Sequence, residues 1–239
     1  MKPAELGRRL GSPLWVWSQA RDAWLHVYDS LSRSEFAGLY RTVRPYTMSG
    51  NARLRGLYQA VHHVVAGAVP GAVVECGTAR GGSAALMGLA LARLGAERPL
   101  WVFDTFEGIP PPTAADPDEA IARLYTGDFR GELPEVRALF ERLGILSRTR
   151  LVKGLFQDTV PTAAVNPIAV LHLDGDWYES VKVCLDHLYD RVSPGGIIQI
   201  DDYGHWEGAR KAVDEFLLDR GLRVRLRILD YTGRQFVKP

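Results

Sequence analysis

The chain has 239 residues, of which 46% are hydrophobic and 24% are charged, and its formal net charge at pH 7 is +1. This length fits one large domain or one domain with a cap, and the composition excludes a disordered chain, a collagen and a coiled coil. A net charge near zero provides no global field that attracts nucleic acid or an anionic membrane, and no apolar run is long enough to span a bilayer. We therefore expect neither nucleic acid nor a membrane among its partners.

The cysteine count and the first residues both bear on the location of the protein. Cys76 and Cys184 are the only cysteines, which is too few for a disulfide scaffold. Residues Met1 to Ser12 contain no hydrophobic segment of the kind found in secretory signals. Both observations favour a cytoplasmic protein.

The N-terminal segment, from about Glu5 to Arg44, has helical spacing and is rich in aromatic residues. It predicts a helical cap over residues 1–50, packed on the main domain or on another subunit. Because aromatic side chains are enriched at subunit contacts, we expect a homo-oligomer, in the form of a dimer. A helix on a membrane surface is the weaker alternative, because basic residues do not dominate a polar face. A further helix is expected over Leu54–Val69, where apolar residues repeat with helical period.

Residues 51–239 alternate between short apolar runs and helical segments, which predicts an α/β domain around a mostly parallel sheet. Two further runs flank the turn signal Tyr231-Thr232-Gly233, so a C-terminal antiparallel hairpin is expected. Residues 105–149 are longer than a simple crossover and contain Pro110-Pro111-Pro112, which indicates a lid insertion. The five predicted parallel strands are Ala72–Cys76, Leu100–Phe103, Leu151–Lys153, Ile168–Leu173 and Gly196–Ile200.

The end of the first strand carries Glu75, and the loop after it carries Gly77 and, at the start of a helix, Ser83. It is neither the dinucleotide fingerprint nor a P-loop, because the glycine spacing and the lysine those motifs need are missing. An acid directly before a glycine loop would repel a pyrophosphate. The pattern favours a cationic ligand, such as the ammonium and sulfonium groups of S-adenosylmethionine.

Residues after the second and third strands suggest how a nucleoside would bind. Asp104 ends the second strand, where an acid can accept hydrogen bonds from ribose hydroxyls. The alternative for Asp104 is to cap the next segment of the chain. Phe156 and Gln157 come after the third strand and offer an aromatic ring and an amide for adenine, although Phe156 is equally suited to the core.

Four carboxylates lie just after the fourth and fifth strands. Asp174 and Asp176 come after one strand, and Asp201 and Asp202 after the other. Like charges at one sheet edge raise one another's pKa or require a cation, and Mg²⁺ is the natural oxygen-bound candidate. Helix capping explains one of these acids more easily than four. His172 lies within an apolar strand and is expected to be a core histidine.

These motifs in this order resemble the macrocin O-methyltransferase (TylF) family, over about Thr47 to Phe216. The resemblance implies a class I methyltransferase fold of Rossmann-like type, S-adenosylmethionine and Mg²⁺ as cofactors, and a sugar hydroxyl of a natural product or other glycoside as the acceptor. The motifs that carry it are Val74-Glu75-Cys76-Gly77 through Arg80-Gly81-Gly82-Ser83-Ala84, Phe103-Asp104-Thr105-Phe106-Glu107-Gly108, Leu173-Asp174-Gly175-Asp176-Trp177-Tyr178-Glu179-Ser180, and Pro194-Gly195-Gly196 with Asp201-Asp202-Tyr203.

The resemblance also implies roles for individual residues. Asp176 corresponds to the general base, and His205 is the alternative, because some relatives use a histidine. The metal ligands implied are Asp174, Asp201 and Asp202. The cofactor contacts implied are Glu75, Gly77, Ser83, Asp104, Phe156, Gln157 and Asp174, together with Thr47, Met48 and Ser49, which resemble a segment that closes over the cofactor.

Three other functions compete with this interpretation. Asp174-Gly175-Asp176 is also a D-x-D motif, which in glycosyltransferases holds a metal and a nucleotide-sugar. A nicotinamide dehydrogenase is the second alternative, weakened by the missing G-x-G-x-x-G motif. A binding protein that keeps the cofactor pocket without catalysis is the third. Within the methyltransferase hypothesis the acceptor stays open: a glycosylated natural product, a free or nucleotide-linked sugar, a cell-surface glycan or a phenol all fit.

Overall fold

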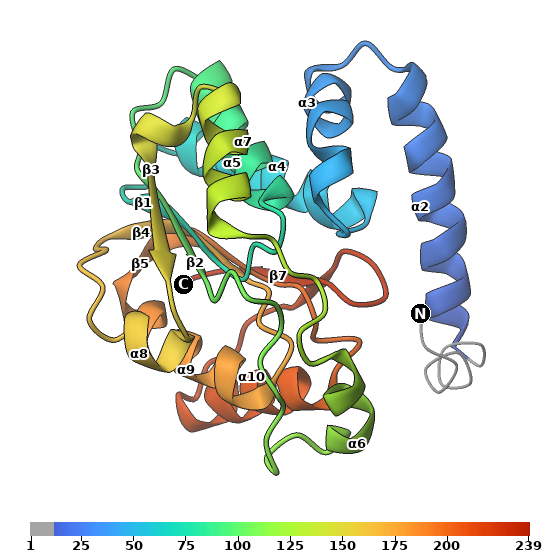
Figure 1. Ribbon diagram of the computed structural model, residues 1–239, viewed down its shortest axis with the longest axis vertical. Helices are drawn as coiled ribbons and strands as arrows, with labels where there is room; N and C mark the ends of the chain where they lie inside the picture. The colour runs from blue at the N-terminus through green and yellow to red at the C-terminus, as the bar shows by residue number, and fades with distance from the viewer. Residues whose placement is uncertain (1–11) are drawn as a thin grey trace.

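The computed structural model describes residues 12–239 (Figure 1). The part of the predicted cap over residues 1–11 lies outside these described residues. The described cap consists of helices α2 (Pro13–Leu31) and α3 (Glu35–Val43), followed by the short 3-10 helix η1 (Arg44–Tyr46). Serine side chains begin both helices: Ser12 accepts a hydrogen bond from the backbone N–H of Trp15, and Ser34 accepts one from Ala37. Both are N-cap contacts of the ordinary kind.

The seven strands form one sheet in the order β3-β2-β1-β4-β5-β7-β6. The five strands β1 to β5 are parallel, and β7 pairs antiparallel with both β5 and β6. This confirms the mostly parallel sheet with a C-terminal antiparallel hairpin. The strands are β1 (Ala72–Cys76), β2 (Leu100–Asp104), β3 (Thr149–Lys153), β4 (Ile168–Leu173), β5 (Val192–Ile200), β6 (Arg227–Ile228) and β7 (Arg234–Val237).

Helices cover both faces of the sheet (Figure 1). Because β1 and β4 are buried along their whole length, their side chains point alternately to the two faces of the sheet and pack into two separate apolar layers. The first layer is completed by α4 (Asn51–Ala66), α5 (Gly82–Arg93) and α7 (Leu133–Arg142), on which α3 also packs. The second is completed by α9 (Tyr178–Leu188) and α10 (Glu207–Asp219), next to the short helix α8 (Phe156–Thr159).

The segment between β2 and β3 has two parts. Helix α7 is the crossover helix, and residues 105–132, here called the insertion, contain α6 (Glu119–Ala122) and η2 (Arg123–Tyr125). The insertion is fastened to the start of α9: the indole N–H of Trp177 donates to the carbonyl oxygen of Pro110 at 2.6 Å. Two more 3-10 helices, η3 (Leu146–Arg148) and η4 (Tyr189–Arg191), precede β3 and β5.

Strand order reverses between β1 and β4, because the chain runs outward from β1 to β3 and then returns to the other side of β1. In open α/β sheets, ligands bind beyond the carboxyl ends of the strands at such a switch point. Among residues 12–239, no helix has the length and apolar character needed to cross a membrane.

Candidate active site

A cavity of about 570 Å³ opens at the carboxyl ends of the parallel strands. This volume lies within the range of small-molecule sites, roughly 300–1,000 Å³. The cavity is lined by every site residue expected from the sequence except Glu75. Those residues are Thr47, Met48, Ser49, Gly77, Ser83, Asp104, Phe156, Gln157, Asp174, Asp176, Asp201 and Asp202.

The glycine loop forms one half of the cavity, and Gly77 explains why glycine is needed there. Gly77 has a φ of +90°, and a Cβ atom at this position would collide with the carbonyl oxygen of Asp174. Only glycine combines that backbone conformation with so close an approach. The loops after β1 and β4 are therefore in direct backbone contact.

Asp104 joins the glycine loop to the end of β2. Its Oδ2 accepts hydrogen bonds from the backbone N–H groups of Thr78 and Ala79, at 2.7 and 3.0 Å. Its Oδ1 accepts one from Phe106 at 2.7 Å, which closes a turn after β2; the next helix, α6, begins only at Glu119, so Asp104 is not a helix N-cap. The side chain also reaches the cavity, where the expected ribose contact would be made. Burial raises the pKa of Asp104, and the backbone donors oppose that effect.

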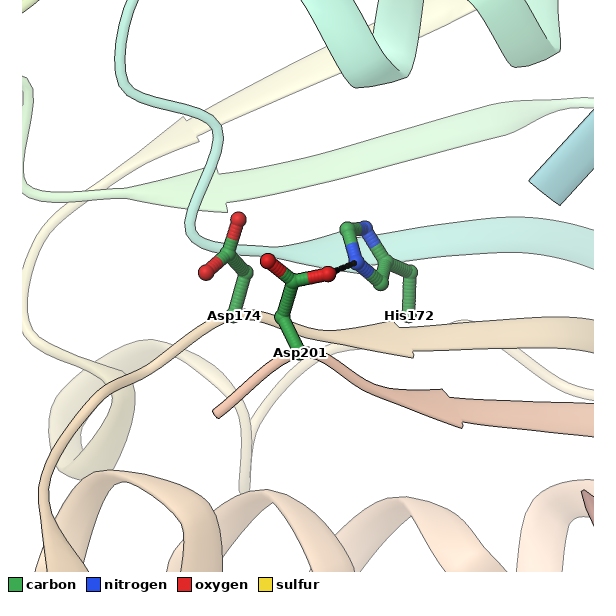
Figure 2. Close-up of side chains that lie close together, drawn as sticks. All are labelled: His172, Asp174 and Asp201. Carbon is green, nitrogen blue, oxygen red and sulfur yellow. Dashed lines mark hydrogen bonds and ion pairs between the residues drawn. The ribbon is translucent and has the colours of Figure 1, made fainter. Parts of the chain in front are cut away.

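The acid cluster (Asp174, Asp176, Asp201 and Asp202) forms the other half of the cavity. The backbone N–H of Asp174 donates to Cys76 on β1, and that of Asp201 donates to Leu173 on β4, both at 2.8 Å. These bonds continue the pairing of adjacent strands one step beyond their ends. The two carboxylates consequently project side by side from β4 and β5 (Figure 2).

Charge in the cluster is unevenly compensated. Burial, followed by repulsion from Asp201 and Asp202, raises the pKa of Asp174 well above its ordinary value. Burial and the neighbouring Asp201 raise the pKa of Asp202 to about 7. Burial acts in the same direction on Asp201, but Arg53 and His172 outweigh it and lower the pKa of that carboxyl. Without a further cation, the cluster therefore favours the ionised form of Asp201 and the protonated forms of Asp174 and Asp202.

His172 is fully buried, as expected of a core histidine, but it also contacts the acid cluster. Its Nδ1 lies 2.9 Å from Oε1 of Glu75, and its Nε2 lies 3.3 Å from Oδ1 of Asp201. Burial opposes protonation, yet the two carboxylates raise the pKa of His172 to about 9. Protonated His172 thus donates to both carboxylates. Glu75, expected to face the cofactor, is fully buried against this ring and does not line the cavity.

The ligand atoms of His172, Asp174 and Asp201 lie within 4.8 Å of one another (Figure 2). This is metal-site spacing, but both ring nitrogens of His172 already contact carboxylates. Asp174, Asp201 and Asp202 are therefore the groups that can offer oxygen to a hard cation, although Oδ1 of Asp201 already contacts His172.

Arg53 is a site residue that the sequence interpretation missed. It lies in the first turn of α4, lines the cavity, and its Nη1 contacts Oδ2 of Asp201. Its Nε donates to Oδ2 of Asp230 at 3.0 Å. No local sequence signal marks this role, because α4 and the loops after β5 and β6 meet only in the folded chain.

Asp176 is held in an unusual conformation. Its φ is +57°, a region that non-glycine residues rarely occupy and that is frequent at functional sites. Oδ1 accepts a hydrogen bond from the indole N–H of Trp206 at 3.0 Å, and the backbone N–H of Asp176 points to Asp202 at 3.4 Å. Burial and the charge of Asp202 raise the pKa of Asp176 well above its ordinary value. A carboxyl with a raised pKa is suited to taking up a proton.

Apolar side chains close the cavity around the acid cluster. Trp206 packs edge-to-face against Tyr125 of the insertion, with ring centroids 5.5 Å apart. His205 packs against Trp206 at 4.4 Å and also lines the cavity. The remaining apolar lining from the insertion comes from Ile109, Pro110 and Phe129.

Residues 21–238 match the family described as Macrocin-O-methyltransferase (TylF). The chain is 40% identical over 193 residues to the 8-demethyl-8-(2,3-dimethoxy-alpha-L-rhamnosyl)-tetracenomycin-C 4'-O-methyltransferase of Streptomyces olivaceus, covering 79% of this chain and 74% of that one. It is 37% identical over 201 residues to the mycinamicin III 3''-O-methyltransferase of Micromonospora griseorubida, covering 81% and 78%.

Solved structures show the same fold. The O-methyltransferase NovP superposes with a TM-score of 0.76 at 36% identity, covering 81% of this chain and 82% of that one. An SAH-bound methyltransferase of Podospora anserina superposes with a TM-score of 0.58 at 15% identity, covering 92% and 96%. The sheet order and the C-terminal hairpin are thus those of the class I methyltransferase fold.

Proposed function

Because the chain belongs to the macrocin O-methyltransferase (TylF) family, we propose that it is a Mg²⁺-dependent enzyme that transfers the methyl group of S-adenosylmethionine to a sugar hydroxyl of a natural product. Family membership makes the protein an O-methyltransferase, so the glycosyltransferase and the non-catalytic binding protein are set aside. The observation that carries the finer proposal is the meeting of the glycine loop and four carboxylates in one cavity.

The half of the cavity around the glycine loop fits S-adenosylmethionine. Gly77 brings the backbone close to the ligand space, and Ser83 lies in the first turn of α5. Asp104 offers carboxylate oxygens to the ribose, and Phe156 with Gln157 offers a ring and an amide to the adenine. The segment Thr47–Ser49 lines the cavity from the cap side.

The acid cluster fits a divalent cation. Arg53 and His172 are the cations that contact it among the described residues, and both do so through Asp201. Burial first, and repulsion between neighbouring carboxylates second, raise the pKa of three of the four carboxyl groups, and a bound cation would favour their ionised forms. Asp174, Asp201 and Asp202 would hold the ion through oxygen, as Mg²⁺ prefers. When bound, Mg²⁺ supplies positive charge that lowers the pKa of an acceptor hydroxyl.

The protein's own groups then have two tasks. The first is to hold the acceptor oxygen in line with the methyl group, and such positioning can lower a barrier by roughly 7–11 kcal/mol. The second is to remove the hydroxyl proton, which we assign to Asp176, because its carboxyl lines the cavity beside the carboxylates that would hold the metal. Trp206 fixes the carboxyl by donating to Oδ1. His205, whose ring packs at a tilt against the same indole, is the alternative base.

The walls around the acid cluster support a sugar attached to an apolar natural product. Ile109, Pro110 and Phe129 face the cavity from the insertion, and Trp206 faces it from the start of α10. A nucleotide-linked sugar would bring a diphosphate toward four carboxylates. The names of the relatives, acting on a rhamnosyl tetracenomycin and on mycinamicin III, support the same acceptor class.

Incubation with a panel of purified glycosides tests this function. We expect S-adenosylmethionine and Mg²⁺ together to add one methyl group to a glycosylated natural product, detected by mass spectrometry. Excess EDTA should abolish turnover, and added Mg²⁺ should restore it. Full activity in EDTA would remove Mg²⁺ from the mechanism, and methylation of nucleotide-sugars alone would overturn the acceptor class.

We also propose that the enzyme is cytoplasmic and dimeric. The thiols of Cys76 and Cys184 are both free and buried, which fits a reducing compartment. Helix α2 leaves large apolar side chains exposed on one side of the cap, where a second copy could cover them. Those side chains, between 49% and 81% exposed, are Val16, Trp17, Trp24, Val27, Tyr28 and Leu31.

A further inference from the structure

Five charged side chains form an alternating chain through the acid cluster, in the order Glu75, His172, Asp201, Arg53 and Asp230. His172 occupies Oδ1 of Asp201, and Arg53 occupies Oδ2. Each of these two cations also contacts a second carboxylate: His172 contacts Glu75, and Arg53 contacts Asp230. A divalent cation that takes an oxygen of Asp201 therefore meets a carboxylate that already has two positive partners.

The two partners of Asp201 differ in their freedom to move. His172 is fully buried, and Glu75 behind it is fully buried as well. Arg53 is 16% exposed and lines the cavity, so its guanidinium has open space beside it. Of the two donors, Arg53 is the one that can leave Asp201 without disturbing the core.

Asp230 is a rigid anchor for Arg53. Its Oδ1 accepts backbone N–H bonds from Thr232 at 2.9 Å and from Gly233 at 2.6 Å, which fixes the turn between β6 and β7. Its Oδ2 receives Nε of Arg53. A Cβ atom on Gly233 would lie 2.8 Å from Cγ of Arg53, so this turn is also shaped to admit the arginine stem.

We propose that Arg53 is a built-in counter-cation of the acid cluster, which releases Asp201 when a divalent cation binds and pivots on its contact with Asp230. The Nη1 contact breaks while the Nε contact is kept. Arg53 thereby neutralises part of the cluster in the metal-free enzyme and competes with the ion for Oδ2 of Asp201. This inference rests on the proposed Mg²⁺ dependence.

Calorimetric titration of the purified protein with MgCl₂, in the presence of S-adenosylhomocysteine, tests the competition. Because a hydrogen bond between charged groups must be broken in the wild type, we expect Arg53→Gln to bind Mg²⁺ with a Kd about tenfold lower. Arg53→Lys keeps the charge but cannot bridge both aspartates, and its Kd should fall between those two. In the absence of metal, thermal unfolding should rank the stabilities as wild type first, Arg53→Lys second and Arg53→Gln last.

Arg220→Gln is the matched control. Arg220 forms an exposed ion pair with Asp190, at 2.7 Å, and neither residue lines the cavity. Its Kd for Mg²⁺ should equal that of the wild type. An Arg53→Gln variant that binds Mg²⁺ equally or more weakly, while the wild type binds it, would overturn the inference alone. A wild type that binds no Mg²⁺ would instead overturn the proposed metal dependence.

A crystal structure of the wild type with Mg²⁺ and S-adenosylhomocysteine supplies a measurement that needs no variant. We expect Nη1 of Arg53 to lie more than about 4 Å from Asp201, beyond ion-pair contact, with Nε still on Asp230. If Nη1 stays bound to Asp201 beside the metal, Arg53 supports that carboxylate and does not compete for it, and the proposal is wrong.

Discussion

The two halves of the cavity differ in the groups that form them. The half around the glycine loop is largely backbone: Gly77 sets the path of the chain, and the N–H groups of Thr78 and Ala79 hold Asp104. The half around β4 and β5 is made of ionisable side chains, whose pKa values depend on one another. Shape governs the first half and charge governs the second.

This difference implies different sensitivities. In the charged half, an isosteric change that removes one charge leaves the shape intact but alters the chemistry. In the backbone half, a single added methyl group alters the shape and changes no charge. Substitutions of each kind, together with a change of pH, can therefore separate the two halves, and the largest effect is expected in the charged half.

Asp176→Asn should reduce kcat by about 10²–10⁴-fold, the usual contribution of a general base. The amide keeps the size of the side chain and can still accept from Trp206 through its oxygen. Binding of S-adenosylhomocysteine, measured by calorimetry, should remain within error of the wild type. An unchanged kcat would show that Asp176 is not the general base, and His205 would be the next residue to replace.

Gly77→Ala should destabilise the protein and weaken cofactor binding together. A side chain at a φ of +90° carries backbone strain of about 1–3 kcal/mol, and here the added Cβ atom also meets the carbonyl oxygen of Asp174. Chemical denaturation and cofactor titration measure the two effects. Gly144→Ala is the control, because Gly144 has a φ of +70° with nothing within 4 Å of an added Cβ. Equal losses in both variants would show that strain alone matters.

The metal-free protein should become less stable as the pH rises from 5 to 9. Folded Asp202 keeps its proton to about pH 7, whereas the unfolded chain loses it near 3.8. Folded His172 keeps its proton to about pH 9, whereas the unfolded chain loses it near 6.5. In both cases the folded state binds more protons, so the free energy of unfolding falls with rising pH.

Thermal unfolding in EDTA across this pH range should show the Tm falling by several degrees. Saturating Mg²⁺ should reduce the slope, because the ion compensates the carboxylates once they ionise. A Tm that stays constant from pH 5 to 9 without metal would contradict the charge distribution described for the cluster.

The strands, and the residues at their carboxyl ends, could be predicted from the sequence. The carboxyl ends of parallel strands lie at the same edge of the sheet. Because Asp104, Asp174 and Asp201 each follow an apolar run, the sequence predicts that they line one cavity. The hairpin could be predicted because the turn signal Tyr231-Thr232-Gly233 separates the segments 223–229 and 234–238, although β6 covers only Arg227–Ile228. These features depend on local patterns combined with one general rule of sheet topology.

Other features depend on contacts that no local pattern records. Glu75 was expected to face a cationic ligand, but the register between β1 and β4 sets it opposite His172, which binds its carboxylate inside the sheet. Arg53 reaches Asp201 across 148 positions of sequence. Register and helix packing thus decide which charged groups meet, and they depend on the whole fold.

Asp116 of the insertion accepts the backbone N–H of Tyr178 at 2.7 Å, so it completes the first turn of α9 from 62 residues away. Helix α9 begins directly after the loop that carries Asp174 and Asp176. Lifting the insertion to exchange substrate and product would uncap this helix and strip the indole of Trp177 from its acceptor. The insertion forms one wall of the cavity and is hydrogen-bonded to the helix that follows the acid-bearing loop, so any displacement of this wall would disturb the loop that carries Asp174 and Asp176.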